Sequence, residues 1–240
     1  MESLETELDR ARQLREADLT DAIESIGFEC TRCGACCKAV EGCSSQAASE
    51  CGSAGDQPAT DEREAHTATV FPDEIRRLQD VGSEDYDWRD VARPMPFGLV
   101  DGGDGPEGET FEWALQTDDC GDCTFYAEDD GVGACTAHAD RPLICRTYPF
   151  SVDLGGTDQP MGEQVDQEGM VRAHECEGLG REISRKGAEE LAGALKERAI
   201  RELEEAIAVR DAYAPAGAGS GEVVVHDSEG AKRPDGSRYE

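Results

Sequence analysis

The segment Cys30-Thr-Arg-Cys33-Gly-Ala-Cys36-Cys37 places four thiols within eight residues. Cysteines separated by two residues can bring their sulfurs to one metal ion, because a tight turn or one helical turn folds them back together. Consecutive side chains point in well-separated directions, so Cys36 and Cys37 are not expected to bind the same single ion. The segment therefore predicts two metal sites or one polynuclear centre, and a fold organised around metal.

The remaining cysteines of the chain lie downstream, at Cys43, Cys51, Cys120, Cys123, Cys135, Cys145 and Cys176. The odd total of eleven cysteines and the acidic N-terminal stretch, which is unlike a signal peptide, argue against an exported protein held by disulfides. We therefore expect a cytoplasmic protein with reduced thiols. His138 and His174 lie close to cysteines in the sequence and could complete a zinc site, although a surface or supporting role is favoured for both.

Several spaced motifs follow the first cysteines in a defined order: Cys123-Thr-Phe125-Tyr126, then Gly133-Ala-Cys135, then the run from Arg141 to Phe150, and finally Cys176-Glu-Gly178. With Phe28 and the first four cysteines, these motifs resemble the CxxCxxCC proteins, also called YkgJ-like, a zinc- or iron-chelating domain. The resemblance spans about residues 26 to 182. It implies eight metal ligands, which are Cys30, Cys33, Cys36, Cys37, Cys123, Cys135, Cys145 and Cys176.

The other residues near these motifs receive weaker assignments. Cys120 lies outside the family pattern and is an alternative ligand, whereas Cys43 and Cys51 are expected to be free thiols outside the core. Arg146 is expected to offset the negative charge of the thiolates. Tyr148 and Phe150 either shield the site from water or belong to the ordinary core.

Thiolate ligands suit zinc and iron–sulfur clusters about equally well, so two cofactors remain open. The adjacent cysteines and the eight expected ligands favour an iron–sulfur centre slightly, which points to electron transfer with an unidentified redox or other protein partner. The first alternative is a zinc-stapled structural or interaction module. The second is a protein-lysine N-methylase-like enzyme, since some proteins resembling this family are linked to flagellin lysine methylation. No catalytic residue is assigned.

The chain is strongly acidic, with 54 aspartates and glutamates against 23 lysines and arginines and a net charge of −31. Carboxylates spread along a chain with few lysines are typical of proteins from salt-accumulating archaea, and we expect a halophilic protein. Such a field repels phosphate backbones, so nucleic-acid binding is not expected. No apolar stretch approaches the roughly 20 residues needed to span a membrane.

The periodicity of the chain predicts an α+β fold, with a small irregular sheet and cysteine-bearing loops packed against amphipathic helices. Short helices are expected from Pro72 and over residues 86–92, and strands over residues 97–100, 110–116, 123–126 and 150–154. We expect an N-terminal amphipathic helix over residues 1–27, broken near residues 18–20, and a metal-binding domain over residues 28–182. Residues 40–66 are expected to be a flexible insertion, 183–213 a C-terminal helix and 214–240 a disordered tail.

The high negative charge predicts that stability depends on salt. At molar salt the Debye length falls to about 3 Å, which screens the repulsion between carboxylates. Dialysis into dilute buffer should therefore lower the unfolding midpoint. If the midpoint, followed by circular dichroism, stays constant from low to molar KCl, the halophilic interpretation is wrong.

Overall fold

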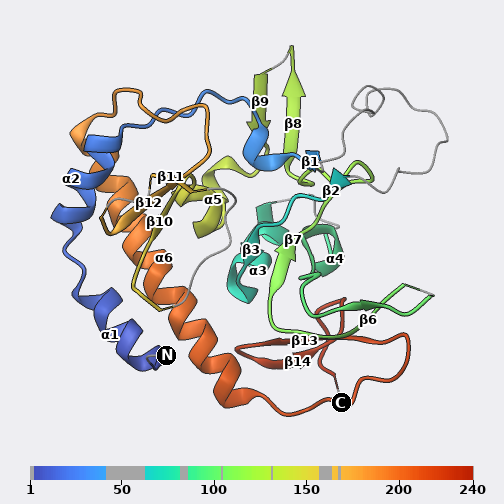
Figure 1. Ribbon diagram of the computed structural model, residues 1–240. Coiled ribbons are helices and arrows are strands. Elements are labelled where there is room, and N and C mark those ends of the chain that lie inside the picture. The colour runs from blue at the N-terminus through green and yellow to red at the C-terminus, as the bar shows by residue number, and fades with distance from the viewer. Residues whose placement is uncertain are drawn as a thin grey trace.

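The computed structural model describes residues 3–41, 63–81, 86–103, 105–130, 132–156, 164–166 and 169–239 (Figure 1). Its helices are α1 (Leu4–Gln13), α2 (Glu16–Ile26), α3 (Pro72–Val81), α4 (Trp88–Val91), α5 (Leu143–Thr147) and α6 (Arg185–Ala212), with the 3₁₀ turns η1 (Ala35–Cys37) and η2 (His138–Asp140). The mixture of helices and several small sheets confirms the α+β prediction.

The strands are short and form separate small sheets. They are β1 (Val40–Glu41), β2 (Arg63–Glu64), β3 (Thr69–Val70), β4 (Ala92–Pro94), β5 (Val100–Asp101), β6 (Pro106–Thr110), β7 (Trp113–Leu115), β8 (Tyr126–Asp129), β9 (Val132–Cys135), β10 (Phe150–Val152), β11 (Gln164–Asp166), β12 (Val171–His174), β13 (Val223–Asp227) and β14 (Gly230–Lys232). Their orders in the sheets are β1-β2, β10-β12-β11, β14-β13-β6-β5, β3-β7-β4 and β8-β9.

A first hydrophobic core joins the long helix α6 to α1, α2 and the sheet β10-β12-β11. Leu19 and Ile23 of α2 and Leu195 of α6 are almost completely buried there. The N-terminus of α6 is capped by Ser184, whose hydroxyl accepts a hydrogen bond from the Gly187 amide at 3.1 Å. Figure 1 shows α6 crossing the molecule, with α1 and α2 along one side of it. The predicted C-terminal helix is confirmed, with slightly narrower bounds.

The N-terminal region contains two helices with a break earlier than predicted. The expected interruption near residues 18–20 is wrong, because α2 runs through these residues. The chain bends at Leu14 and Arg15, where the backbone is extended, and the Leu14 side chain is 6% exposed. Burial of Leu14 in the first core thus sets the break.

A second core packs α3 and α4 against the sheet β3-β7-β4 and strand β13. At its centre the rings of Trp88 and Trp113 meet edge to face with centroids 5.1 Å apart, a favourable aromatic geometry. The helix predicted to begin at Pro72 is confirmed, and its first-turn carboxylate Glu74 is buried. The helix predicted over residues 86–92 is confirmed as the shorter α4.

The C-terminal region contains β13 and β14, so the predicted disordered tail over residues 214–240 is wrong for residues 223–232. Strand β13 pairs in parallel with β6, with Val225 opposite Thr110, and Val224 and Val225 are completely buried. The glycine- and charge-rich composition suggested disorder, but the run of valines supplies a β-strand to the second core.

The predicted flexible insertion at residues 40–66 lies largely outside the described residues. Its two described ends form the pair β1–β2, with Val40 opposite Glu64. Within the part of the chain that the structure describes, no helix is long and apolar enough to cross a membrane.

The packing of β13 gives a testable prediction. Replacing Val225 by alanine removes two buried methyl groups from the second core and should lower the free energy of unfolding by about 1–3 kcal/mol. Val100→Ala is the matched control, because Val100 lies in the same sheet and is 61% exposed. Urea unfolding checks both variants, and equal stabilities for the two would contradict the burial of β13.

Candidate metal centre

The cysteine segment, defined here as residues 28–37, runs between the two hydrophobic cores. At its start, Phe28 forms an isolated β-bridge with Leu179. The ring of Phe28 packs edge to face on the ring of Phe150 in the first core, with the ring centroids 5.8 Å apart. At its end, Cys37 packs against the second core. Figure 1 shows the segment, in blue, passing from α2 to the β8–β9 hairpin. The segment therefore connects the cores as well as carrying thiols.

The first half of the segment is held beside Cys176. The Glu29 amide donates a hydrogen bond to the Gly178 carbonyl at 3.0 Å, and the Gly178 amide donates to the sulfur of Cys176 at 3.4 Å. Only glycine fits at position 178, because a Cβ there would lie 2.3 Å from the Glu29 carbonyl oxygen. Burial raises the pKa of Cys176, and the neighbouring Cys33 and Cys30 thiolates also contribute.

The second half of the segment is held beside the β8–β9 hairpin. The Cys123 amide donates to the Cys37 carbonyl at 2.8 Å, and the Gly133 amide donates to the Arg32 carbonyl at 2.7 Å. Gly34 takes a positive φ of 78°, and a Cβ there would lie 2.3 Å from the Tyr126 hydroxyl oxygen. The absence of a side chain at Gly34 therefore lets the turn approach the hairpin.

Cys135 and Cys145 complete the same neighbourhood. Cys135 is the last residue of β9 and lies opposite Tyr126 in the hairpin. Cys145 lies in the middle of the five-residue helix α5 and packs against the second core. Burial raises the pKa of Cys145 well above its usual range, and the thiolates of Cys123, Cys36 and Cys135 raise it further.

The predicted ligands therefore fall into two sets. The Cys30 set lies at the edge of the first core and consists of Cys30, Cys33 and Cys176. The Cys37 set lies at the second core and consists of Cys37, Cys123, Cys135 and Cys145.

Cys36 lies between the two sets. Its sulfur is 3.8 Å from that of Cys37, and the hydrogen bond between the two thiols lowers the pKa of Cys36 to about 7. Its thiolate also raises the pKa values of Cys145 and Cys176, one in each set. The thiolate of Cys36 therefore acts electrostatically on both sets.

The donors fit a thiophilic metal in their chemistry. All eight predicted ligands are free cysteines, and burial raises the pKa of Cys123 to about 11, so its thiolate is costly without a cation. Across the described residues, no group of three or more histidine, cysteine, aspartate or glutamate side chains is arranged so that it could hold a metal ion. The backbone brings the thiols into two sets, and metal binding would require their side chains to rotate.

Other predicted residues lie elsewhere or have different partners. Cys120 is disulfide-bonded, so the alternative ligand role is wrong for this structure. Cys43 and Cys51 lie outside the described residues. His174 is completely buried on β12 and its Nε2 lies 2.8 Å from the Ser151 hydroxyl, whereas His138 is exposed on η2.

The arginine beside the thiols is Arg141, which the sequence analysis missed. Arg146 is exposed, whereas the positive charge of Arg141 helps to lower the pKa of Cys36. Burial raises the pKa of Cys135, and Arg141 offsets part of that increase. Arg141 also donates from Nε to the His138 carbonyl at 3.1 Å. Its place directly before Pro142 in the motif was the available signal. Phe150 is completely buried in the first core. Of the two roles expected for it, this position agrees with that of an ordinary core residue.

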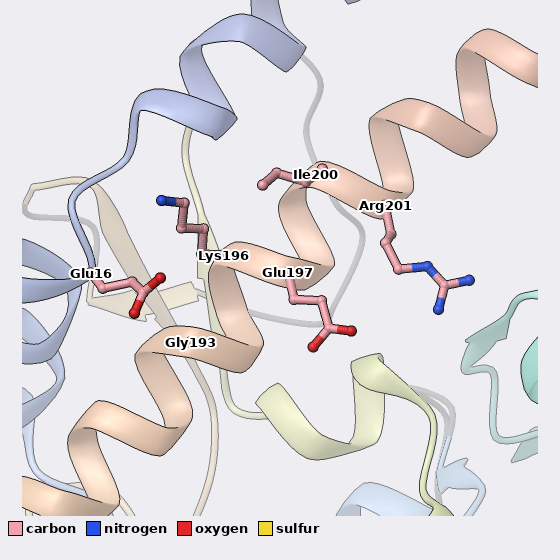
Figure 2. A pocket seen from close by; sticks show the side chains of 6 residues that line it. All are labelled: Glu16, Gly193, Lys196, Glu197, Ile200 and Arg201. Atoms are coloured by element: carbon pink, nitrogen blue, oxygen red, sulfur yellow. The ribbon is translucent and has the colours of Figure 1, made fainter.

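A shallow hollow on α6 lies apart from these cysteines. It has a volume of about 270 Å³ and is lined by Glu16, Gly193, Lys196, Glu197, Ile200 and Arg201. Figure 2 shows that charged side chains surround it and that Glu16 faces it from α2. No thiol lines this hollow, so the chemistry of the candidate centre lies at the cysteine segment.

The close approach at Gly178 gives a second prediction. Gly178→Ala forces the Glu29 carbonyl away and should destabilise the protein by about 1–3 kcal/mol, as overpacking does. It should also reduce metal binding by the Cys30 set, measured by elemental analysis after reconstitution. Gly193→Ala is the control, because a Cβ at Gly193 meets nothing within 4 Å in α6. Unchanged metal content and stability in Gly178→Ala would contradict the described contact.

Comparisons with known proteins agree with this description. No curated protein and no solved structure matches the chain. The model of one family, CxxCxxCC, described as "Putative zinc- or iron-chelating domain", matches residues 29–177. The match contains the seven cysteines of the two sets and Cys36, and it covers more than half of the chain. The chain therefore belongs to the CxxCxxCC family of zinc- or iron-chelating domains.

Proposed function

We propose that the chain chelates metal at two neighbouring four-thiolate centres. The Cys30 centre would use Cys30, Cys33, Cys36 and Cys176, and the Cys37 centre would use Cys37, Cys123, Cys135 and Cys145. The observation that carries the proposal is the anchoring of the cysteine segment at both ends, by Gly178 at one end and by Cys123 at the other. With the segment anchored in this way, Cys36 and Cys37 would bind metal in different centres although they are adjacent in sequence.

We propose iron–sulfur clusters as the occupants and electron transfer as the role. A cubane cluster takes four cysteine thiolates, which agrees with two sets of four. When bound, such a cluster supplies a one-electron couple. Cys30 and Cys36 are exposed, so the proposed Cys30 centre lies close to the surface that a redox partner would approach. The charge of −31 favours a partner with a basic surface.

A zinc-stapled module is the second candidate, and a specific observation favours it. The Cys30 set is flanked by Phe28 and Leu179, which pack against the first core, and the Cys37 set packs in the second core. One continuous segment supplies thiols to both sets. Zinc bound by four thiolates has no open position for water, so its role would be structural. Its binding energy would then stabilise the junction between the cores.

The metal itself decides between the candidates. Anaerobic purification in high salt, followed by elemental analysis and a visible spectrum, should give about eight iron and eight sulfide per chain for two cubane clusters. About two zinc per chain without colour would support the zinc module instead. A protein that binds neither metal after reconstitution would contradict both.

Single cysteine variants test the two-centre arrangement. Cys176→Ser and Cys145→Ser should each remove about half of the bound metal, because each variant takes one of four ligands from a different centre. Cys120→Ser is the control and should retain the full amount, since Cys120 is disulfide-bonded. Loss of all metal in both variants would indicate one shared centre, and retention in both would overturn the ligand assignment.

A further inference from the structure

A buried chain of hydrogen bonds crosses α5, the short helix that carries Cys145. The Leu143 amide donates to Oε1 of Glu74 on α3 at 2.9 Å. The Thr147 hydroxyl donates to the Leu143 carbonyl at 2.8 Å and accepts from the guanidinium of Arg198 on α6 at 3.1 Å. Both ends of α5 are therefore bound by charged side chains from other helices. We call Glu74, Thr147 and Arg198 the α5 clamp.

The residues of the clamp are among the most deeply buried polar side chains. Glu74 is 1% exposed, Thr147 is completely buried, and Arg198 is 2% exposed. Arg198 also donates from Nε to Glu202 at 2.7 Å and from Nη1 to the Phe150 carbonyl at 3.4 Å. Its bonds thus reach both the last residue of α5 and the first residue of β10.

Stability alone does not account for these buried charges. An ion loses hydration when it is buried, and apolar side chains of similar volume often serve as well or better in a core. What an arginine adds at this point is a rigid set of directed donors. These donors hold a helix of five residues, which has too few internal hydrogen bonds to be stable alone.

We propose that the α5 clamp is a positioning device for Cys145 in the Cys37 centre. Glu74 fixes the start of α5 from the second core, and Arg198 fixes its end from α6. Cys145 lies between these two points, two residues from each of Leu143 and Thr147. The inference rests on the proposed function, because Cys145 must be a metal ligand. Glu74, Thr147 and Arg198 are not metal ligands in this role and act through the hydrogen bonds that hold α5.

Thr147→Val tests the clamp with little change in shape, because valine keeps the volume of threonine and loses its hydroxyl. Thr20→Val is the matched control: Thr20 is 2% exposed on α2, and its hydroxyl bonds to the Glu16 carbonyl four residues earlier at 2.7 Å. Arg198→Met and Arg198→Lys complete the series. Methionine removes the hydrogen-bond donors. Lysine keeps the positive charge but loses the fixed donor geometry of the guanidinium group.

The measurement uses the full chain loaded with Co²⁺, whose thiolate charge-transfer bands report thiolate ligation. Transfer of Co²⁺ to excess EDTA should occur in two phases, and Cys145→Ser identifies the phase of the Cys37 centre by removing it. Thr147→Val should accelerate that phase by about tenfold, which corresponds to about one buried hydrogen bond. Arg198→Met should accelerate it at least as much, because it removes all the hydrogen bonds that Arg198 donates. Arg198→Lys should fall between these variants and the wild type. The phase of the Cys30 centre should stay unchanged, and Thr20→Val should match the wild type.

The outcomes separate the inference from the proposal beneath it. If the wild type shows one phase, or Cys145→Ser keeps both, the two-centre proposal fails and the clamp fails with it. If the wild type shows two phases and the variants release Co²⁺ at wild-type rates, only the clamp is overturned. Equal acceleration of both phases also overturns it, because it indicates a general loss of stability.

Discussion

Two backbone hydrogen bonds hold the cysteine segment where it lies, one from Glu29 to Gly178 and one from Cys123 to Cys37. Each joins the segment to a region that packs on a different core. The positions of the two sets of thiols therefore follow mainly from main-chain hydrogen bonds. Glycine at position 178 is necessary to this arrangement, because the backbones approach too closely there for any Cβ.

Charge is the second constraint on the molecule. Buried thiols disfavour ionisation, as the raised pKa values of Cys123 and Cys145 show, and the many carboxylates of the chain add to the negative field. Arg141 is the cation that acts on Cys36 and Cys135. One arginine offsets only a small part of the charge of several thiolates, which is why a bound cation fits this site better than an empty one.

Local signals predicted the parts of this fold that local interactions determine. Pro72 and the carboxylates after it indicated the start of α3, and the periodicity of α6 was strong enough to place it closely. The motif spacing also identified the family. The missed features depend on distant partners: β13 exists as a strand because β6 accepts it, and α2 begins at Glu16 because Leu14 is buried by other elements. Arg141 rather than Arg146 acts on the thiols for the same reason, since only the folded chain shows which of them faces Cys36.

The pairing of β13 with β6 has a consequence for how the protein is made. The first core needs α1, α2 and α6, and the second core needs β7 together with Val225 of β13. Segments of the two cores alternate along the chain, so neither core can close early during translation. The thiols of residues 30–37 leave the ribosome long before either core is complete, and a cell must keep them reduced and unaggregated until β13 has been synthesised.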